Sequence, residues 1–472
     1  MKKLILGLAL VTSMNIMAQN PFFEEFNTVH NTPPFSQINA ESYPEAIDRA
    51  IALNKQEVDM ICNQRSTPDF DNTIVALENA GKDLNRVLSV FYNLLEANSD
   101  DRMMEISLEV SPKLSDLSTS IMLNERLWLR IKEVYANRDK FNLAPEQMQL
   151  LQNTYDSFAR NGARLEGADR EKYRQIQAEL SELTTRFGQN VLKELKTYNI
   201  YLTEEEMAGL PADLIAAAAA DAEAAGKKGE YLFTLAQPTY IAVLKSADRR
   251  DVRERFYRLY AARNTKGEFS NVEIMKRIAN LRLELANLLG YKSYAEYSLV
   301  KTMAGNPNSV YDLLNRLRDA YKPALQAEMK ELNEFASELE GEPIEVKPWD
   351  YSYYSNKLRN ARYSYDEEEM RPYFPLNQVE EGVFGLANKL YGLTFTQNDS
   401  IEVYHPDVKA YDVKDSDGRF LGVLYTDFFP RDSKRPGAWM TNFRDQYIDE
   451  DGVNHRPQVS IVMNFTKPTA DK

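Results

Sequence analysis

The stretch from Ser400 to Lys472 has the pattern of β-strands, whereas most of the chain before it has the pattern of helices. A polar turn at 415–418 separates valines from an apolar run at 420–425, which predicts a hairpin. A further run alternates with period two and places four apolar residues on one face, Val459, Ile461, Met463 and Phe465. A sheet face needs a covering element, and only seven residues follow Phe465. We therefore expect this face to be partly uncovered.

Helical periodicity fills the first half of the chain, where apolar residues recur at three, four and seven positions. Ser42 and Glu45 have the spacing of a capping box at the start of one such helix. Pro211 and an alanine-rich run that stops at Gly226 predict a short helix at the edge of a subdomain. The chain should therefore be mainly α-helical, with its strands close to the C-terminal end.

The first eighteen residues have the form of a secretory signal peptide. Lys2 and Lys3 precede an apolar run over 4–11, and residues 16–18 form a cleavage site. This run is shorter than the roughly 20 residues that cross a bilayer, and no later apolar run reaches that length. The cleavage site has no cysteine to which a lipid anchor could be attached. We expect a chain released into a Gram-negative periplasm or the medium, with no membrane partner.

Charge and cysteine content argue against a nucleic-acid-binding protein and against a protein held together by an internal disulfide. The chain has 57 basic and 71 acidic residues, and loss of Lys2 and Lys3 with the leader changes its net charge from −14 to −16. Such a surface repels phosphates, so nucleic acid is not an expected partner. Cys62 is the single cysteine and cannot form an internal disulfide. Because it follows Val58 by four residues on an apolar stripe, we interpret it as a buried, inert thiol.

The chain offers few residues for catalysis. Its three histidines, His30, His405 and His455, lie far apart, and no His-Glu-x-x-His motif occurs. His405 and His455 flank predicted strands, where we expect structural hydrogen bonds rather than metal ligation. No Gly-x-Ser-x-Gly elbow or glycine-rich phosphate loop is present. The residues by themselves therefore give no catalytic and no metal-binding candidate.

Two features could hold a peptide. Three tyrosines, Tyr351, Tyr353 and Tyr354, follow Trp349 closely and could either line a cleft, where they would donate hydrogen bonds to a peptide carbonyl, or simply pack together. The edge of the predicted sheet could pair with an extended peptide through backbone hydrogen bonds, whatever the sequence of the peptide.

Motifs along nearly the whole chain carry a resemblance to a known family. They are NPF (20–22), FDNT (70–73), FTLAQPTY (233–240), LRLELANLLGY (281–291), KTMA (301–304), WDYSYY (349–354), YFPL (373–376), YTDFFPR (425–431) and GAW (437–439). In this order the motifs resemble the thimet oligopeptidase family, nearest to its bacterial peptidyl-dipeptidase (dipeptidyl carboxypeptidase) branch.

The resemblance implies a mainly α, multi-helical, two-lobed zincin-type peptidase scaffold with a small antiparallel β-sheet near the C-terminus. It implies an N-terminal helical domain over 19–228, after the signal peptide at 1–18, and the first, incomplete part of a peptidase domain over 229–472. In the family the strand that resembles 459–465 is soon followed by the His-Glu-x-x-His helix. That helix, a later glutamate ligand and further His and Tyr residues would lie beyond Lys472, so the catalytic part is expected to be truncated.

No catalytic or metal residue can therefore be transferred to this sequence. The resemblance does transfer a set of substrate-binding neighbours of the cleft, Gly437, Ala438, Trp439, Asn464, Tyr353 and Tyr354. Zinc is expected in the complete family enzyme and not on this chain, which we predict to be inactive alone. Short peptides are the expected partners, and the chain should be a monomer that can associate through its uncovered sheet.

Two functions remain open at this point. The first is the N-terminal portion of a secreted zinc metallopeptidase that removes C-terminal dipeptides from short peptides. The second is a non-catalytic helical protein that binds peptides or a partner chain on the same scaffold. Exposed apolar surface on the sheet would favour the first, and a clean monomer without such surface would favour the second.

Overall fold

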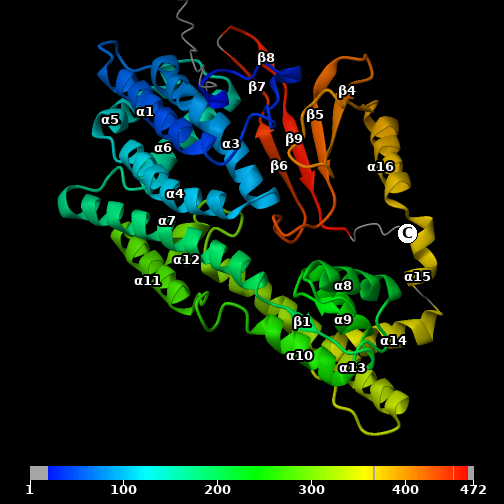
Figure 1. Cartoon of the computed structure of the whole chain (residues 1–472). Coiled ribbons are helices and arrows are strands. Elements are labelled where there is room, and N and C mark those ends of the chain that lie inside the picture. The colour runs from blue at the N-terminus through cyan, green and yellow to red at the C-terminus, as the bar shows by residue number, and fades with distance from the viewer. Residues whose placement is uncertain (1–19, 365–366, 450, 466–472) are drawn as a thin grey trace, which may run out of the picture.

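The computed structural model describes residues 20–364, 367–449 and 451–465, so the signal peptide predicted for 1–18 lies outside the described residues. Helices make up most of the described chain and a small sheet forms close to its C-terminal end (Figure 1), which confirms the predicted mainly helical class. None of the helices in the described ranges has the length and apolar character needed to cross a bilayer.

The α-helices follow one another from the N-terminal end to the sheet. They are α1 (Ser42–Asn63), α2 (Ala76–Asn79), α3 (Lys82–Ala97), α4 (Asp101–Met122), α5 (Glu125–Ala136), α6 (Pro145–Arg160), α7 (Gly167–Leu195), α8 (Ala212–Ala224), α9 (Gln237–Ser246), α10 (Arg250–Ala261), α11 (Val272–Leu288), α12 (Tyr294–Leu299), α13 (Pro307–Glu340), α14 (Tyr351–Tyr363), α15 (Glu367–Met370) and α16 (Leu376–Tyr391). Short turns of 3-10 or π-helix are η1 (Pro21–Phe23), η2 (Val29–Asn31), η3 (Phe70–Val75), η4 (Arg138–Lys140) and η5 (Arg371–Tyr373).

Local signals set several of these boundaries. The long helix α13 begins where the Asn306 side chain accepts the N–H of Ser309 and Pro307 takes the first helical position, and it ends at Gly341 with φ 73°. The capping box predicted at the start of α1 is wrong. Ser42 is already the first helical residue, and its hydroxyl accepts the backbone N–H of Asn39, which precedes the helix.

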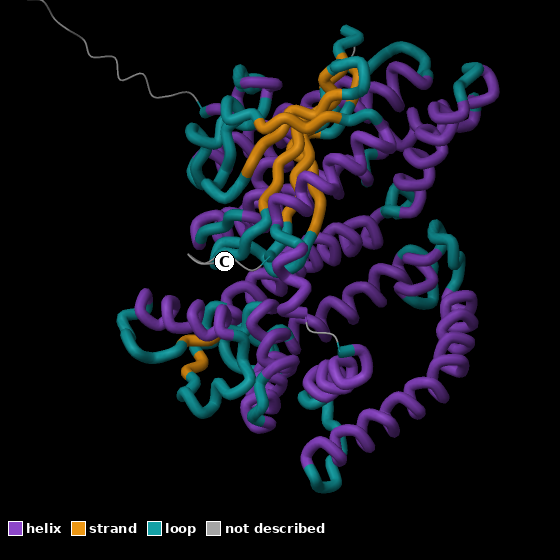
Figure 2. Tube along the Cα trace, turned by 90° about the vertical axis from the view of Figure 1, so that its right-hand side faces the viewer, coloured by secondary structure: helices purple, strands orange, loops and turns teal. Residues whose placement is uncertain are grey.

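The strands form one five-stranded sheet and two short pairs. They are β1 (Ile200–Tyr201), β2 (Leu232–Phe233), β3 (Thr394–Gln397), β4 (Lys409–Lys414), β5 (Phe420–Asp427), β6 (Trp439–Arg444), β7 (Tyr447–Ile448), β8 (Asn454–His455) and β9 (Gln458–Val462). The order in the main sheet is β3-β4-β5-β9-β6, with β6 at one edge. Figure 2 shows these strands together in one half of the molecule and the β1–β2 pair in the other.

The predicted hairpin is confirmed as β4 and β5, but the prediction of a wholly antiparallel sheet is wrong. β9 pairs antiparallel with β6 and parallel with β5. After β5 the chain first forms the edge strand β6 and then returns between the two. β6 runs in the direction opposite to β5. Because β9 runs opposite to β6, it runs in the same direction as β5.

One face of the sheet packs on the N-terminal helices. Val423, Tyr425 and Phe443 share a core with Ile47 of α1 and Phe91 of α3, in which all five side chains are buried. Figure 1 shows α1 and α3 beside the sheet, although close to three hundred residues or more separate these helices from it in the chain. The sheet is therefore held in place by the N-terminal helices.

The other face of the sheet is only partly covered. α16 lies over β3 and β4, where Phe384 stacks on Phe395 and Glu380 accepts the Tyr411 hydroxyl at 2.8 Å. Toward β6 the cover ends. Val459, Ile461 and Met463 are half-buried and Phe465 is 44% exposed, so the expectation of a partly uncovered face is confirmed.

Candidate functional site

A buried charge cluster marks the end of β5. The Asp427 carboxylate is fully buried and accepts hydrogen bonds from Arg431 at 2.9 and 2.6 Å, from Lys434 Nζ at 2.9 Å and from the Tyr404 hydroxyl at 2.8 Å. Burial acts to raise the pKa of Asp427, but the hydrogen bonds and charges of Arg431 and Lys434 outweigh it and hold this pKa below its usual value. We refer to these four residues as the Asp427 cluster.

The cluster organises the loop 428–438 that joins β5 to β6. Lys434 Nζ also donates to the carbonyl of Phe429 at 2.8 Å, which folds the loop back on itself. Arg431 donates to the carbonyl of Ala97 at 2.5 Å, and the N–H of Arg435 donates to the carbonyl of Glu96 at 2.8 Å. The loop is thereby fixed to the C-terminal end of α3.

Gly437 and Ala438 end the loop, and Trp439 is the first residue of β6. Gly437 has φ 116°, a conformation that residues with a Cβ rarely adopt. The Asn464 side chain donates to the carbonyl of Gly437 at 2.7 Å and to that of Arg435 at 3.1 Å. The structure thus brings together four of the six residues predicted to bind substrate.

β6 is the edge strand beside this loop, and α3 occupies its outer side at Asn442 but not at Met440. Asn93 of α3 donates to the carbonyl of Asn442 at 2.9 Å, so the backbone groups of Asn442 point away from β9. The backbone groups of successive residues in a strand point to opposite sides. Met440 lies two residues before Asn442, so its N–H and C=O also point away from β9. Met440 is 63% exposed and makes no hydrogen bond outside the sheet to any residue that the structure describes.

A pocket of about 480 Å³ opens at the N-terminal end of β6, between the loop and helices of the other half of the molecule. Its wall comprises Leu95, Ser99, Met104, Leu192, Leu195, Lys196, Asn199, Asp221, Ala224, Leu232, Thr234, Ala236, Arg431, Asp432, Ser433, Lys434, Arg435 and Pro436. The site therefore combines a strand edge with an adjoining hollow, an arrangement that suits a ligand in extended conformation.

The two tyrosines predicted to bind substrate lie elsewhere, in α14. Tyr353 is 6% exposed and donates to Asp248 at 2.9 Å, and Tyr354 is 2% exposed and donates to Glu340 at 3.1 Å. Burial, then the bond to Glu340, raises the pKa of Tyr354 to about 12. Neither residue lines the pocket. Their role in substrate binding stays a prediction, and their observed contacts are those of packed side chains.

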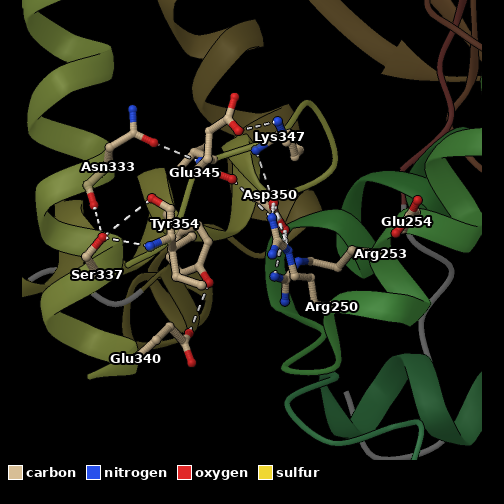
Figure 3. A network of polar contacts seen from close by, with 12 residues as sticks. Arg250, Arg253, Glu254, Asn333, Ser337, Glu340, Glu345, Lys347, Asp350 and Tyr354 are labelled. Atoms are coloured by element: carbon tan, nitrogen blue, oxygen red, sulfur yellow. Dashed lines mark hydrogen bonds and ion pairs between the residues drawn. The ribbon is translucent and has the colours of Figure 1, made fainter. Parts of the chain in front are cut away.

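A second buried charge network lies next to these tyrosines (Figure 3). Asp350 is fully buried and accepts hydrogen bonds from Arg250 at 2.6 Å, from Arg253 at 3.0 Å and from the N–H of Lys347 at 3.1 Å. The Arg253 guanidinium also lies 4.0 Å from the centre of the Tyr353 ring. This network joins α10 to the start of α14.

The side chains present do not fit a zinc site. His30 contacts Asp412 at 3.0 Å, His455 contacts Asp449 at 2.7 Å, and His405 accepts a backbone N–H at 3.1 Å, so all three have structural roles. No group of three or more His, Cys, Asp or Glu side chains suited to a metal ion occurs within 20–364, 367–449 and 451–465. His405 and His455 make hydrogen bonds of the kind expected for structural residues beside strands.

Two of the residues that organise the site escaped prediction, Asp427 and Lys434. Asp427 belongs to the YTDFFPR segment that carried the resemblance, and a charged residue inside such an apolar run was the available signal. Cys62, predicted to be buried, is half-buried, and burial raises the pKa of its thiol. A thiol with a raised pKa is a poor nucleophile, in agreement with the predicted inert role.

Comparison with known proteins places this geometry in a family. Residues 243–472 match the model of peptidase family M3, a family of zinc metallopeptidases. The chain is 32% identical to the dipeptidyl carboxypeptidase of Salmonella typhimurium over 96% of its own length and 66% of that protein. It is 32% identical to oligopeptidase A of Salmonella typhimurium and of Escherichia coli, over 96% of its length and 67% of theirs. It thus spans about two thirds of the length of these relatives. The chain belongs to peptidase family M3.

Proposed function

We propose that this chain forms the peptide-holding part of a secreted oligopeptidase that removes C-terminal dipeptides from short peptides. The observation that carries the proposal is the open edge of β6 beside the pocket. The relatives named dipeptidyl carboxypeptidase and oligopeptidase A support a peptide as the ligand. The signal peptide predicted for residues 1–18 supports export to the periplasm.

Backbone pairing is the mode of binding that this geometry supports. An extended peptide added to β6 would accept from the N–H of Met440 and donate to its C=O, whatever the side chains of the peptide. The Asp427 cluster and the Asn464 side chain hold the loop before β6, so the edge is fixed before a peptide arrives. A preformed edge reduces the entropy lost on binding.

The proposal assigns the zinc chemistry to polypeptide outside residues 1–472. When bound, zinc would supply an activated water for attack on the peptide bond. The chain has no His-Glu-x-x-His motif, and its three histidines are engaged elsewhere. The residues of this chain would hold and orient the peptide, and by themselves they would not hydrolyse it.

We expect residues 19–472, purified alone, to retain much less than one zinc per chain and to release no dipeptide from a blocked tetrapeptide. Atomic absorption measures the metal, and chromatography measures the products after zinc addition. The dipeptidyl carboxypeptidase of Salmonella typhimurium is the positive control. Stoichiometric zinc together with metal-dependent turnover would overturn the assignment.

We expect Met440→Pro to weaken peptide binding by about five- to tenfold, because proline removes the outward N–H and one hydrogen bond with it. An edge strand tolerates proline, since no bond to β9 is lost. Met440→Ala removes the same side chain but keeps the N–H, so it should bind within about twofold of the original chain. Fluorescence anisotropy with a labelled tetrapeptide gives both Kd values. Equal binding by the two variants would refute pairing at this residue.

A further inference from the structure

We propose that the pocket at the N-terminal end of β6 is a subsite that accepts one bulky apolar side chain of the bound peptide. The inference rests on the proposed function, because it takes the strand edge as the place where the peptide backbone lies. It adds the substrate class, which is short peptides with an aliphatic or aromatic residue at the position that reaches the pocket.

The position of the pocket along the chain makes this contact possible. Arg435 and Pro436 form part of its wall and lead directly into Gly437 and the start of β6. Three residues lie between Pro436 and Met440, so at most roughly 13 Å of chain separates the two. A peptide paired with Met440 would therefore place a residue three or four positions away at the mouth of the pocket.

Apolar side chains from several elements face this space. They are Leu95 of α3, Met104 of α4, Leu192 and Leu195 of α7, and Leu232 of β2. Leu192 is half-buried and lies outside every hydrophobic cluster of the described core, so it is available to a ligand. The volume of about 480 Å³ exceeds what one phenylalanine or leucine side chain needs and lies within the range of small-molecule sites.

The charges of the wall favour an apolar group over an anion. Arg431 and Lys434 share the single carboxylate of Asp427, and both are engaged with it by hydrogen bonds. Arg435 pairs with Glu96 at 2.7 Å, and Lys196 lies 3.9 Å from Asp101. Each cation of the wall thus already faces a carboxylate. An acidic side chain would lose its hydration in this pocket without gaining an unpaired cation.

A position scan with paired variants tests the subsite. The probes are labelled tetrapeptides in which phenylalanine, serine or aspartate occupies each position in turn on an alanine and glycine background. Ala224→Trp fills the pocket from the C-terminal end of α8, where Ala224 is exposed. Ala216→Trp places the same side chain at an exposed position of the same helix that does not line the pocket. Binding is measured by anisotropy on residues 19–472.

We expect one position at which phenylalanine binds about tenfold or more tightly than serine or aspartate. Ala224→Trp should reduce this ratio to about one and leave the serine peptide within about twofold, whereas Ala216→Trp should keep the ratio. Peptides that bind without any such preference, or a preference that survives Ala224→Trp, would overturn the subsite and leave edge pairing intact. Failure of every peptide to bind would overturn both.

Discussion

Replacing Asp427 by alanine should lower the free energy of unfolding by about 3–5 kcal/mol, because it leaves Arg431 and Lys434 buried without their counter-charge. Burial already lowers the pKa of Lys434, and Asp427 is the main group that opposes this effect. The variant should also release the loop 428–438 from α3. Urea unfolding at neutral pH, followed by circular dichroism, measures the loss.

The matched control is Asp432→Ala in the same loop. Asp432 is exposed, so its removal should change the free energy of unfolding by no more than about 0.5 kcal/mol. The pH dependence gives a second check. The pKa of Asp427 is lower in the folded state, so its contribution is complete above the unfolded value of about 3.9 and is lost as the pH falls through the folded value. The difference between the original chain and Asp427→Ala should therefore shrink in acid. A difference below about 1 kcal/mol at neutral pH would contradict the role of the cluster.

Replacing Asp350 by alanine should produce a loss of similar size, about 3–5 kcal/mol, in the other half of the molecule. Arg253 is 1% exposed and would remain buried without the Asp350 carboxylate that it contacts in Figure 3. Arg250 is 42% exposed and can turn to solvent, so most of the loss should come from Arg253. Urea unfolding measures the change.

Asp251→Ala is the control for this second network. Asp251 lies in α10 beside Arg250, but its side chain is 63% exposed and pairs with Arg249 at the surface. Exposed ion pairs contribute at most about 1 kcal/mol, so this variant should stay close to the original chain. A loss at Asp350→Ala no greater than that at Asp251→Ala would show that the buried network does not stabilise the fold.

Much of the fold could be predicted because periodicity is a local property of the sequence. The turn at 415–418 predicted the hairpin of β4 and β5, and the alternation over 459–465 predicted β9, which ends at Val462 and not at Phe465. The parallel pairing of β5 with β9 could not be predicted in this way. The chain forms the edge strand β6 first, and β9 then enters the sheet between β5 and β6. This order is decided by packing between distant segments.

The part of the site that could be predicted is the part carried by short motifs in the sequence. Gly437 and Asn464 follow from the resemblance, and the structure joins them by a hydrogen bond. The burial of Asp427 depends on α3 and the N-terminal helices, which lie more than three hundred residues earlier. Tyr353 and Tyr354 show the converse limit, since an aromatic cluster has the same sequence pattern whether it lines a cleft or packs inside.

The central claim is that a peptide pairs with the open edge of β6, and amide hydrogen exchange at Met440 tests it most directly. The exchange rates of residues 19–472 would be measured with and without a bound tetrapeptide. We predict that the Met440 amide slows by about a hundredfold when the peptide is present at 100 times its Kd. The amides of Trp439 and Thr441, which point toward β9, should change little. A peptide that binds while the Met440 amide exchanges at its original rate would contradict the account.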